Sequence, residues 1–320
     1  MGIKLQGLAL NVTYACSLKC AHCFFSPSRR GDTLSPAMLR YAMESLREEL
    51  SWVHLTGGEP LLDPEALIGL LEVLHRLHLG DIGIATNGCW AADADDARQL
   101  VARLTELGVT GICVSVDALH QPGVSVETVT RGAEAVAAAG LSGHSYLVTS
   151  LLPEHYPQAA RLNGRSIQLA KRVAETAGLP IAETEIRPLG RATNWQAQCA
   201  DPIPSGPCRD LACCLGETGA FEPQMVWIDP FGNVMICYGL AIGSLAERSL
   251  QAILDEYDPA AAPVLAALAH SGPKHLFDMA RERGVQPVGP FAHECDLCFQ
   301  CRRALRPFFP QTLLPDECYP

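Results

Sequence analysis

Residues 16–23, Cys16-Ser17-Leu18-Lys19-Cys20-Ala21-His22-Cys23, are the stretch on which the expected fold and chemistry depend. They directly follow an apolar run, residues 8–12, that predicts a buried strand. Three thiolates on one loop can converge on a single metal centre, and such soft ligands select iron–sulfur clusters or zinc. No fourth cysteine lies in register, so a cuboidal cluster bound here would keep one iron free of protein ligands.

A second motif, Thr56-Gly57-Gly58-Glu59-Pro60, follows the next apolar run, residues 53–55. Adjacent glycines let a ligand approach the backbone closely, and Glu59 offers a charged acceptor beside it. By itself the motif is also compatible with an ordinary turn from strand to helix. Its place one βα unit after the three cysteines favours a clamp that faces them.

Residues 1–200 alternate short apolar or β-branched runs with longer segments of helical pattern, which indicates parallel βα units. Ser35-Pro36 and Asp63-Pro64 each combine an N-cap with a first-turn proline. The fold class that we predict is α/β, a partial (β/α)6 barrel with its catalytic face at the carboxyl ends of the strands. The predicted strands are residues 8–12, 53–55, 82–85, 111–116, 146–149 and 184–187. The predicted helices are residues 36–49, 64–78, 93 or 95 to 108, 125–139 and 166–177.

Residues 201–320 differ in composition and contain eight of the fourteen cysteines. The turn-rich stretch 201–207 marks the boundary that we expect between a first domain, residues 1–200, and a second, residues 201–320. We expect the second domain to be a small, irregular α+β unit. Its small core would need stabilising cross-links, which metal clusters would provide. Its predicted elements are a hairpin with strands 225–228 and 234–237 and a helix over about residues 250–256.

The composition, 320 residues with 48% hydrophobic and 18% charged, provides a large core and excludes intrinsic disorder. The formal net charge of -11 argues against general binding to nucleic-acid backbones or anionic membranes, which requires clustered Lys and Arg. No apolar run is long enough to span a membrane, and the first residues lack the layout of a signal peptide. We therefore expect a cytoplasmic protein, whose reduced thiols serve as metal ligands rather than as disulfides.

The Cys-x3-Cys-x2-Cys loop, with His22 before its last cysteine and Gly57-Gly58-Glu59-Pro60 after the next strand, resembles the radical SAM superfamily. The resemblance implies a [4Fe–4S] cluster with one open iron, to which S-adenosylmethionine binds. It implies that the reduced cluster passes one electron to the sulfonium, and that a 5′-deoxyadenosyl radical then removes a hydrogen atom from the substrate. An external electron donor of the flavodoxin or ferredoxin type belongs to this scheme.

The same resemblance assigns roles to individual residues. Cys16, Cys20 and Cys23 would hold the cluster, and a structural zinc loop is the alternative. Gly57, Gly58, Glu59 and Pro60 would hold the methionyl amine, with His22 beside the same ligand. Ser, Asn and Asp are also common in turns, so the three assignments that follow have a purely structural alternative. At the ends of the third and fourth predicted strands, the residues expected to contact the ribose and methionyl groups are Asn87, Ser115 and Asp117.

The cysteine-rich part resembles the auxiliary-cluster extension called SPASM, or its shorter twitch form. The motifs that carry this resemblance are Pro188-Leu189-Gly190-Arg191-Ala192, Gly232-x4-Cys237, Gly243-Ser244-Leu245 and Cys295-x2-Cys298-x2-Cys301. An auxiliary [4Fe–4S] cluster is implied, with Cys214, Cys237, Cys295 and Cys298 as expected ligands. Further candidate ligands are Cys208, Cys213, Cys301 and Cys318.

The spacing of these cysteines departs from a full SPASM pattern, which reads Cys-x2-Cys-x5-Cys-x3-Cys before a distant cysteine. Cys213 and Cys214 are adjacent and point apart in most backbone conformations, so both are not expected to be ligands. We therefore favour one auxiliary cluster over two. A zinc ion bound by residues 295–301 is the alternative.

The radical-forming half of the reaction is better specified than the substrate, because function depends on the site rather than on the fold. Our first hypothesis is a maturase of a ribosomally synthesised peptide, in which a cross-link, thioether, oxidation or epimerisation follows loss of a hydrogen atom. Cys16 comes early in the sequence, so leader recognition would need a separate leader-binding protein or the second domain. The second hypothesis is a dehydrogenase of a small metabolite, such as an amino sugar alcohol, with the auxiliary cluster as electron acceptor. A third is a non-enzymatic iron–sulfur scaffold or electron carrier.

The remaining cysteines and histidines give weaker signals. Cys199 lies just before the predicted boundary and is a candidate hydrogen donor to a substrate radical, with an inert thiol as the alternative. Cys89 and Cys113 are expected to be small buried hydrophobic residues. His120, His144 and His155 lie near strand ends, where a proton acceptor is useful, but structural or solvent-facing roles are the default for each.

Overall fold

One sheet organises the protein. The computed structural model describes residues 3–26, 32–47, 50–141, 143–195, 224–287, 289, 291 and 293–320. Within these residues, nine strands follow the order β6-β5-β4-β3-β2-β1-β7-β8-β9. The first six strands in sequence run parallel to one another, as consecutive βα units require. They are β1 (Gly7–Thr13), β2 (Trp52–Gly57), β3 (Asp81–Thr86), β4 (Gly111–Ser115), β5 (Tyr146–Leu151) and β6 (Ile181–Glu185).

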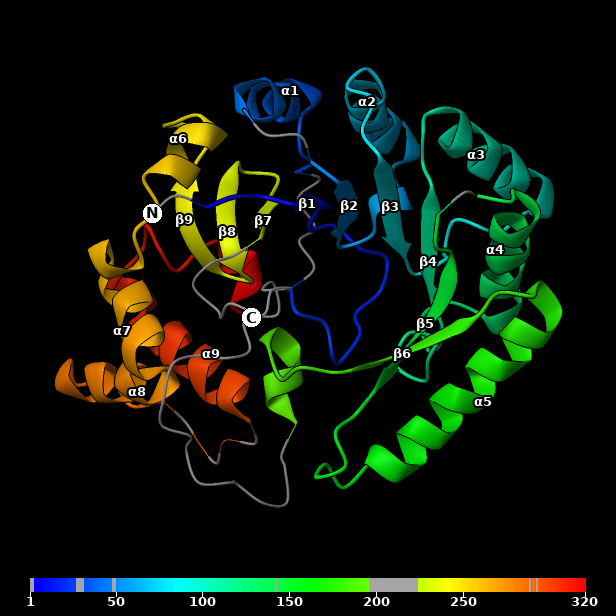
Figure 1. The fold of residues 1–320 in the computed structure, drawn as a ribbon. Coiled ribbons are helices and arrows are strands. Elements are labelled where there is room, and N and C mark those ends of the chain that lie inside the picture. Colours follow the sequence, from blue (N-terminus) through cyan, green and yellow to red (C-terminus); the bar gives the residue numbers. More distant parts are fainter. Residues whose placement is uncertain are drawn as a thin grey trace.

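Five helices lie along the outer side of these strands (Figure 1). The side chains of Ser35, Asp63, Asp93 and Ser125 cap the first four by accepting backbone N–H groups, and the caps Ser35 and Asp63 were predicted. Gly178 ends the fifth with a φ of 77°, a left-handed conformation that suits glycine. The helices are α1 (Pro36–Ser45), α2 (Pro64–His75), α3 (Ala94–Glu106), α4 (Val126–Ala138) and α5 (Ala159–Ala177).

The predicted fold class, α/β with a partial barrel of six strands and five helices, is confirmed. Several boundaries differ from the prediction, among them the end of β5 at Leu151, the start of α5 and both ends of β6. Helix α5 begins at Ala159 rather than at residue 166. Strand β6 is Ile181–Glu185 rather than residues 184–187, because pairing with β5 starts directly after Pro180, whose carbonyl accepts the Leu147 N–H at 2.8 Å. The carboxyl end of β6 therefore comes earlier in the chain than expected.

The cysteine-rich part continues the same sheet. Strand β7 (Met225–Ile228) pairs in parallel with β1, and the antiparallel strands β8 (Asn233–Cys237) and β9 (Leu240–Ser244) extend the sheet further. The predicted hairpin is confirmed, whereas β9 was not predicted. Leu10, Ile228 and Phe299 belong to one continuous hydrophobic core, so both parts of the chain share it. The predicted boundary at residues 200 and 201 lies outside the described residues.

The prediction that the rest of this part is irregular is wrong. Helix α6 (Leu250–Asp255) was expected, but three more helices follow it, and Figure 1 shows them on the β9 side of the sheet. Pro263 and Pro273 occupy first-turn positions, where proline is favoured, so prolines in this part begin helices. Of the described helices, none combines the length and the apolar character needed to cross a bilayer. The additional helices are α7 (Pro263–Ser271), α8 (Pro273–Glu282) and α9 (Glu294–Leu305).

Candidate functional site

Cys16, Cys20 and Cys23 lie half-buried on the loop that follows β1, here called the cysteine loop (residues 16–23). Burial is the main cause that raises the pKa of Cys16 and Cys20 to about 12, and the neighbouring thiols raise it further. Three mutually interacting thiols in this environment stay protonated unless a cation binds them. The donor set therefore fits a metal centre on this loop.

The chain segment after β6 fixes the conformation of the cysteine loop. The backbone N–H of Arg191 donates to the Cys23 carbonyl, and its guanidinium donates to the Lys19 carbonyl, both at 2.9 Å. Gly190 has a φ of 55°, and a Cβ there would lie 2.3 Å from the Phe24 carbonyl oxygen. The motif at residues 188–192 thus has a structural function in the barrel, where it closes over the loop.

Gly57 and Gly58 bring the end of β2 against the backbone of the preceding segment. The N–H of Gly58 donates to the Thr13 carbonyl at 2.6 Å, and the N–H of Glu59 donates to the Ala15 carbonyl at 2.9 Å. A Cβ on Gly58 would lie 2.1 Å from the Ala15 oxygen, which no rearrangement of a side chain could relieve. The sequence reading explained the paired glycines by the approach of a ligand, but the structure adds a second reason, the approach of the protein's own chain.

Glu59 is fully buried, and protein donors occupy its carboxylate. The hydroxyl of Thr86 donates to it at 2.6 Å, the N–H of Asn87 at 2.7 Å and the N–H of Leu61 at 3.0 Å. Burial raises the pKa of Glu59, and these hydrogen bonds oppose that rise. Glu59 and Pro60 do not line the cavity described below. Glu59 instead joins the end of β2 to the end of β3 and so places Asn87.

A cavity of about 280 Å³ lies between the cysteine loop and the carboxyl ends of the barrel strands. Its size is near the lower end of ligand pockets, which span about 300–1,000 Å³. The amide nitrogen of Asn87 lies 3.6 Å from the Cys16 sulfur, so the strand ends reach the thiols directly. Of the predicted site residues, the structure brings together around this cavity Cys16, Cys20, His22, Cys23, Gly57, Gly58, Asn87 and Ser115.

Some lining residues were not predicted. Ser150, Thr184 and Glu185 reach the cavity from the ends of β5 and β6. The sequence reading ended the fifth strand before Ser150 and placed Thr184 and Glu185 inside the sixth, so the correct strand ends would have revealed them. Tyr238 also lines the cavity, and its ring centroid lies 5.0 Å from those of Phe24 and Phe25. An aromatic layer therefore separates the cysteine loop from the end of β8.

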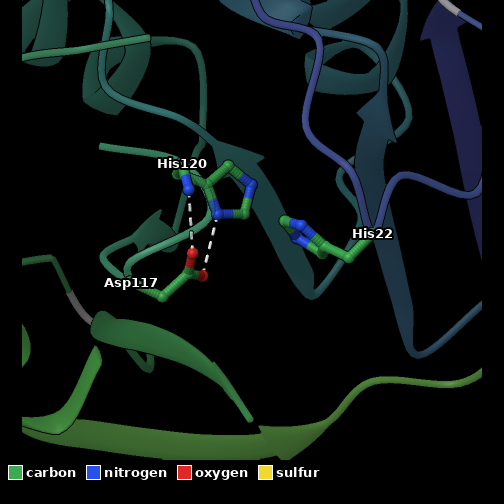
Figure 2. Close-up of side chains that lie close together, drawn as sticks. All are labelled: His22, Asp117 and His120. Carbon is green, nitrogen blue, oxygen red and sulfur yellow. Dashed lines mark hydrogen bonds and ion pairs between the residues drawn. The ribbon is translucent and has the colours of Figure 1, made fainter. Parts of the chain in front are cut away.

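Figure 2 shows His22, a residue of the cysteine loop, close to Asp117 and His120. Asp117 is fully buried and does not line the cavity, whereas His120 does. Oδ2 of Asp117 lies 2.8 Å from Nδ1 of His120. Its Oδ1 accepts the N–H groups of Leu119 and His120 at 2.9 Å. The ring of His22 meets that of His120 edge to face at a centroid distance of 4.6 Å. Sequence reasoning treated His120 as structural, although the spacing Asp-x2-His was a signal for this pair.

The electrostatics of this group favour an oriented imidazole. Burial alone would raise the pKa of Asp117, but the charge and hydrogen bond of His120, together with His22 and a backbone N–H, outweigh burial and hold that pKa well below its usual range. Burial, and secondarily His120, lowers the pKa of His22 to about 4. The ligand atoms of the three side chains lie within 4.8 Å of one another, close enough for a metal ion. Because donors from the protein already occupy both oxygens of Asp117, the arrangement is better suited to fixing the Nδ1–H tautomer of His120, which leaves Nε2 for the cavity.

The described C-terminal cysteines form a second group. Cys237 ends β8, Cys295 and Cys298 lie on α9, and all three are buried. Cys298 interacts electrostatically with Cys237, and Arg302 interacts with all three thiols.

Of the other candidate ligands, Cys301 interacts electrostatically with Cys298 of this trio and also with Asp278 and Asp296. The sulfur of Cys318 lies 3.7 Å from the Tyr14 hydroxyl. Outside the described residues lie Cys199, Cys208, Cys213 and Cys214.

Residues 10–160 match the model of a family described as the Radical SAM superfamily. These residues are a radical SAM domain. The match contains the cysteine loop, Gly57-Gly58-Glu59-Pro60 and the ends of the first five strands, so it confirms the resemblance that these motifs indicate. Enzymes of this superfamily bind S-adenosylmethionine and a [4Fe–4S] cluster, and the three thiols that share a cavity with the strand ends fit this pair of cofactors.

Two curated relatives share part of the chain. The mycofactocin maturase MftC of Mycobacterium tuberculosis is 24% identical over 260 residues, which are 72% of this chain and 63% of that protein. GTP 3′,8-cyclase 1 of the same organism is 29% identical over 208 residues, which are 59% of this chain and 53% of that protein. The chain thus spans less than two thirds of the length of either relative.

Two solved structures share the fold. SuiB of Streptococcus suis, bound to the precursor peptide SuiA, superposes with a TM-score of 0.56 at 13% identity and covers 83% of this chain and 66% of its own. The structure of anSMEcpe with bound AdoMet and a Cp18Cys peptide superposes with a TM-score of 0.51 at 13% identity. The superposition covers 96% of this chain and 98% of that one. Each superposition covers more of this chain than its barrel strands and helices alone.

Replacing Gly58 with Ala tests the contact between β2 and the cysteine loop. We expect Gly58→Ala to lose about four irons per chain, one [4Fe–4S] cluster, because the added Cβ displaces the Ala15 backbone and with it the thiols. The measurement is iron and sulfide per chain after anaerobic reconstitution. Gly164→Ala is the matched control, since an added Cβ there meets no atom within 4 Å. Equal iron content in the two variants would contradict this account of the loop.

Proposed function

We propose that the protein is a radical SAM enzyme that modifies a ribosomally synthesised peptide, and that its C-terminal part is a SPASM-like domain with an auxiliary [4Fe–4S] cluster. The observation that carries the proposal is the single cavity that the thiols of the cysteine loop share with Gly57, Gly58, Asn87 and Ser115. An electron carrier has no need of such a cavity. The proposed domains are residues 1–200 and 201–320, joined through the pairing of β1 with β7.

The chain's own residues bind and orient the cofactors. When bound, the cluster and S-adenosylmethionine together supply the radical that removes one hydrogen atom from the substrate. The thiolates of Cys16, Cys20 and Cys23 hold the cluster, and the side chains of Asn87 and Ser115 offer polar contacts to the nucleoside and the methionyl group. The aromatic layer around Tyr238 keeps water from this end of the cavity.

His120 accepts the proton that an oxidised substrate must release. A two-electron oxidation removes a hydrogen atom, and then one electron and one proton, from the same substrate. An auxiliary cluster held by the C-terminal cysteines would take up the electron, and Nε2 of His120, whose Nδ1 lies 2.8 Å from Oδ2 of Asp117, would accept the proton. Burial keeps His22 neutral at pH 7, so it does not repel the protonated ring of His120.

The relatives support a peptide substrate. SuiB and anSMEcpe were both solved with a peptide bound, and both share the fold over more than four fifths of this chain. MftC is a maturase by name. The reaction also needs an external electron donor of the flavodoxin or ferredoxin type, and leader recognition by a separate protein or by the C-terminal part. A cytoplasmic location keeps the thiols reduced.

A second candidate is a small-metabolite dehydrogenase, with the same cluster as electron acceptor. Two observations favour it. The cavity of about 280 Å³ is small for S-adenosylmethionine and a peptide residue together. A relative that is 29% identical, GTP 3′,8-cyclase 1, acts by its name on a nucleotide.

Transfer of deuterium identifies the substrate. The dithionite-reduced protein is incubated with S-adenosylmethionine and with candidate peptides or amino sugar alcohols that carry deuterium at single positions. We expect deuterium to appear in 5′-deoxyadenosine with a labelled peptide, together with a change in the peptide's mass. Transfer from a labelled alcohol alone would establish the second candidate, and no cleavage of S-adenosylmethionine would contradict both.

Iron content tests the auxiliary cluster. One auxiliary [4Fe–4S] cluster predicts about eight irons per reconstituted chain, because each cubane contains four. Substituting Ala for Cys16, Cys20 and Cys23 together should leave about four. About four irons in the unmodified chain would exclude an auxiliary cluster, and about twelve would require two of them.

Replacing His120 with Gln tests its role in proton transfer. We expect His120→Gln to release 5′-deoxyadenosine but to yield at least about tenfold less oxidised product for each 5′-deoxyadenosine, since general-base catalysis contributes about 10²–10⁴-fold. Liquid chromatography with mass spectrometry quantifies both compounds. His144→Gln, at an exposed histidine, is the control. An unchanged product ratio would show that another group accepts the proton.

A further inference from the structure

A buried guanidinium lies among the C-terminal cysteines. Arg302, on α9, is 1% exposed and is one of the largest fully buried side chains of the described residues. Its Nη1 donates to the Tyr238 carbonyl at 2.7 Å. Among the residues that the structure describes, Nε and Nη2 find no hydrogen-bond acceptor. Burial of a charge with unused donors is strongly unfavourable unless an anion compensates it.

The described surroundings of Arg302 provide no carboxylate in ion-pair contact. The rings of Phe299 and Tyr319 lie 5.9 Å from the guanidinium carbon, and they favour a cation only weakly. The groups beside it that can become anions are the Tyr319 phenol and the thiols of Cys298, Cys237 and Cys295, all of which interact electrostatically with the guanidinium.

The positions of the residues along α9 also place Arg302 beside these thiols. Cys295, Cys298 and Arg302 are related by steps of three and four residues, so they share one face of the helix, and this face meets Cys237 at the end of β8. Arg302 interacts electrostatically with the Cys298 thiol. Arg303 is exposed on another face. The sequence therefore places one permanent cation beside the thiols that a cluster would use.

We propose that Arg302 is the counter-cation of the auxiliary cluster, with Nε and Nη2 as donors to its sulfur atoms, and that it raises the reduction potential of that cluster. The inference rests on the auxiliary cluster of the proposed function. Four thiolates around a [4Fe–4S]²⁺ core carry a net charge of about -2, which becomes about -3 on one-electron reduction. A fixed positive charge in a medium of low dielectric constant stabilises the more negative state more strongly. Arg302 thus makes the cluster a better acceptor of the electron that the substrate loses.

The test uses the full chain with Cys16, Cys20 and Cys23 replaced by Ala, so that only the auxiliary cluster contributes to the signal. Into this parent we introduce Arg302→Met, which removes the charge, Arg302→Lys, which retains it, and the matched control Arg303→Met. Iron and sulfide are counted, and each cluster is titrated with dithionite at fixed pH while its electron paramagnetic resonance signal is recorded. Dithionite is oxidised, and each cluster takes up one electron.

We expect Arg302→Met to favour the oxidised cluster at least tenfold at a given potential, a shift of about 59 mV to more negative values. Arg302→Lys should lie closer to the parent, and Arg303→Met should match it. The proposal would be overturned if the cluster in Arg302→Met had the same midpoint reduction potential as the cluster in Arg303→Met.

Two further outcomes are decisive if Arg302→Met fails to bind iron. A cluster in Arg302→Lys with a midpoint near that of the parent supports the counter-cation, because charge is what the two side chains share. Both variants could instead lose iron while their far-ultraviolet circular dichroism spectra stay the same as that of the parent. This result would show that Arg302 acts by its shape rather than by its charge, and it would overturn the proposal. Failure of the proposed auxiliary cluster is distinct, since the parent itself would then bind no iron with Arg302 intact.

Discussion

The contact between the Gly57-Gly58 turn and the backbone before the cysteine loop is the constraint on which the site depends. Two hydrogen bonds, from Gly58 to Thr13 at 2.6 Å and from Glu59 to Ala15 at 2.9 Å, fix how the chain enters the loop. The buried carboxylate of Glu59 then extends the same connection to Thr86 and the N–H of Asn87 on the next strand. The ends of β1, β2 and β3 are therefore fixed together, and the thiols are presented to the cavity before any cofactor binds. Preorganisation of this kind lowers the cost of assembling a ligand site.

The continuous sheet relates the two groups of cysteines. Because β7 pairs in parallel with β1, Cys237 at the end of β8 belongs to the same sheet as the strand that carries the cysteine loop. Tyr238 contributes its ring to the cavity, and its carbonyl accepts a hydrogen bond from Arg302. A single residue thus contacts the proposed substrate cavity and the proposed counter-cation of the auxiliary cluster. Tyr238 would therefore lie between a substrate in the cavity and an auxiliary cluster beside Arg302.

Local signals predicted the barrel and the thiols but not the interactions that position them. The caps Ser35 and Asp63 and the strand before Cys16 were predictable, because each depends on a few neighbouring residues. Helices α7 and α8 were missed because a proline looks the same at a first helical turn and at a break. The burial of Glu59 and the bond between Asp117 and His120 depend on which strand ends meet in space, and a single sequence gives no measure of that. Ser150 and Glu185 were missed through misplaced strand ends.

The central claim is that the cysteine loop holds a cluster with one iron open to S-adenosylmethionine in the adjoining cavity. Its most direct test is the electron paramagnetic resonance spectrum of the reduced protein, recorded with and without S-adenosylmethionine. Cys295 and Cys298 are replaced by Ala for this test, so that the signal comes from the cysteine loop alone. The account predicts that the g values of the reduced cluster change when S-adenosylmethionine is added. A spectrum indifferent to S-adenosylmethionine, or a loop that binds one zinc ion and no iron, would contradict it.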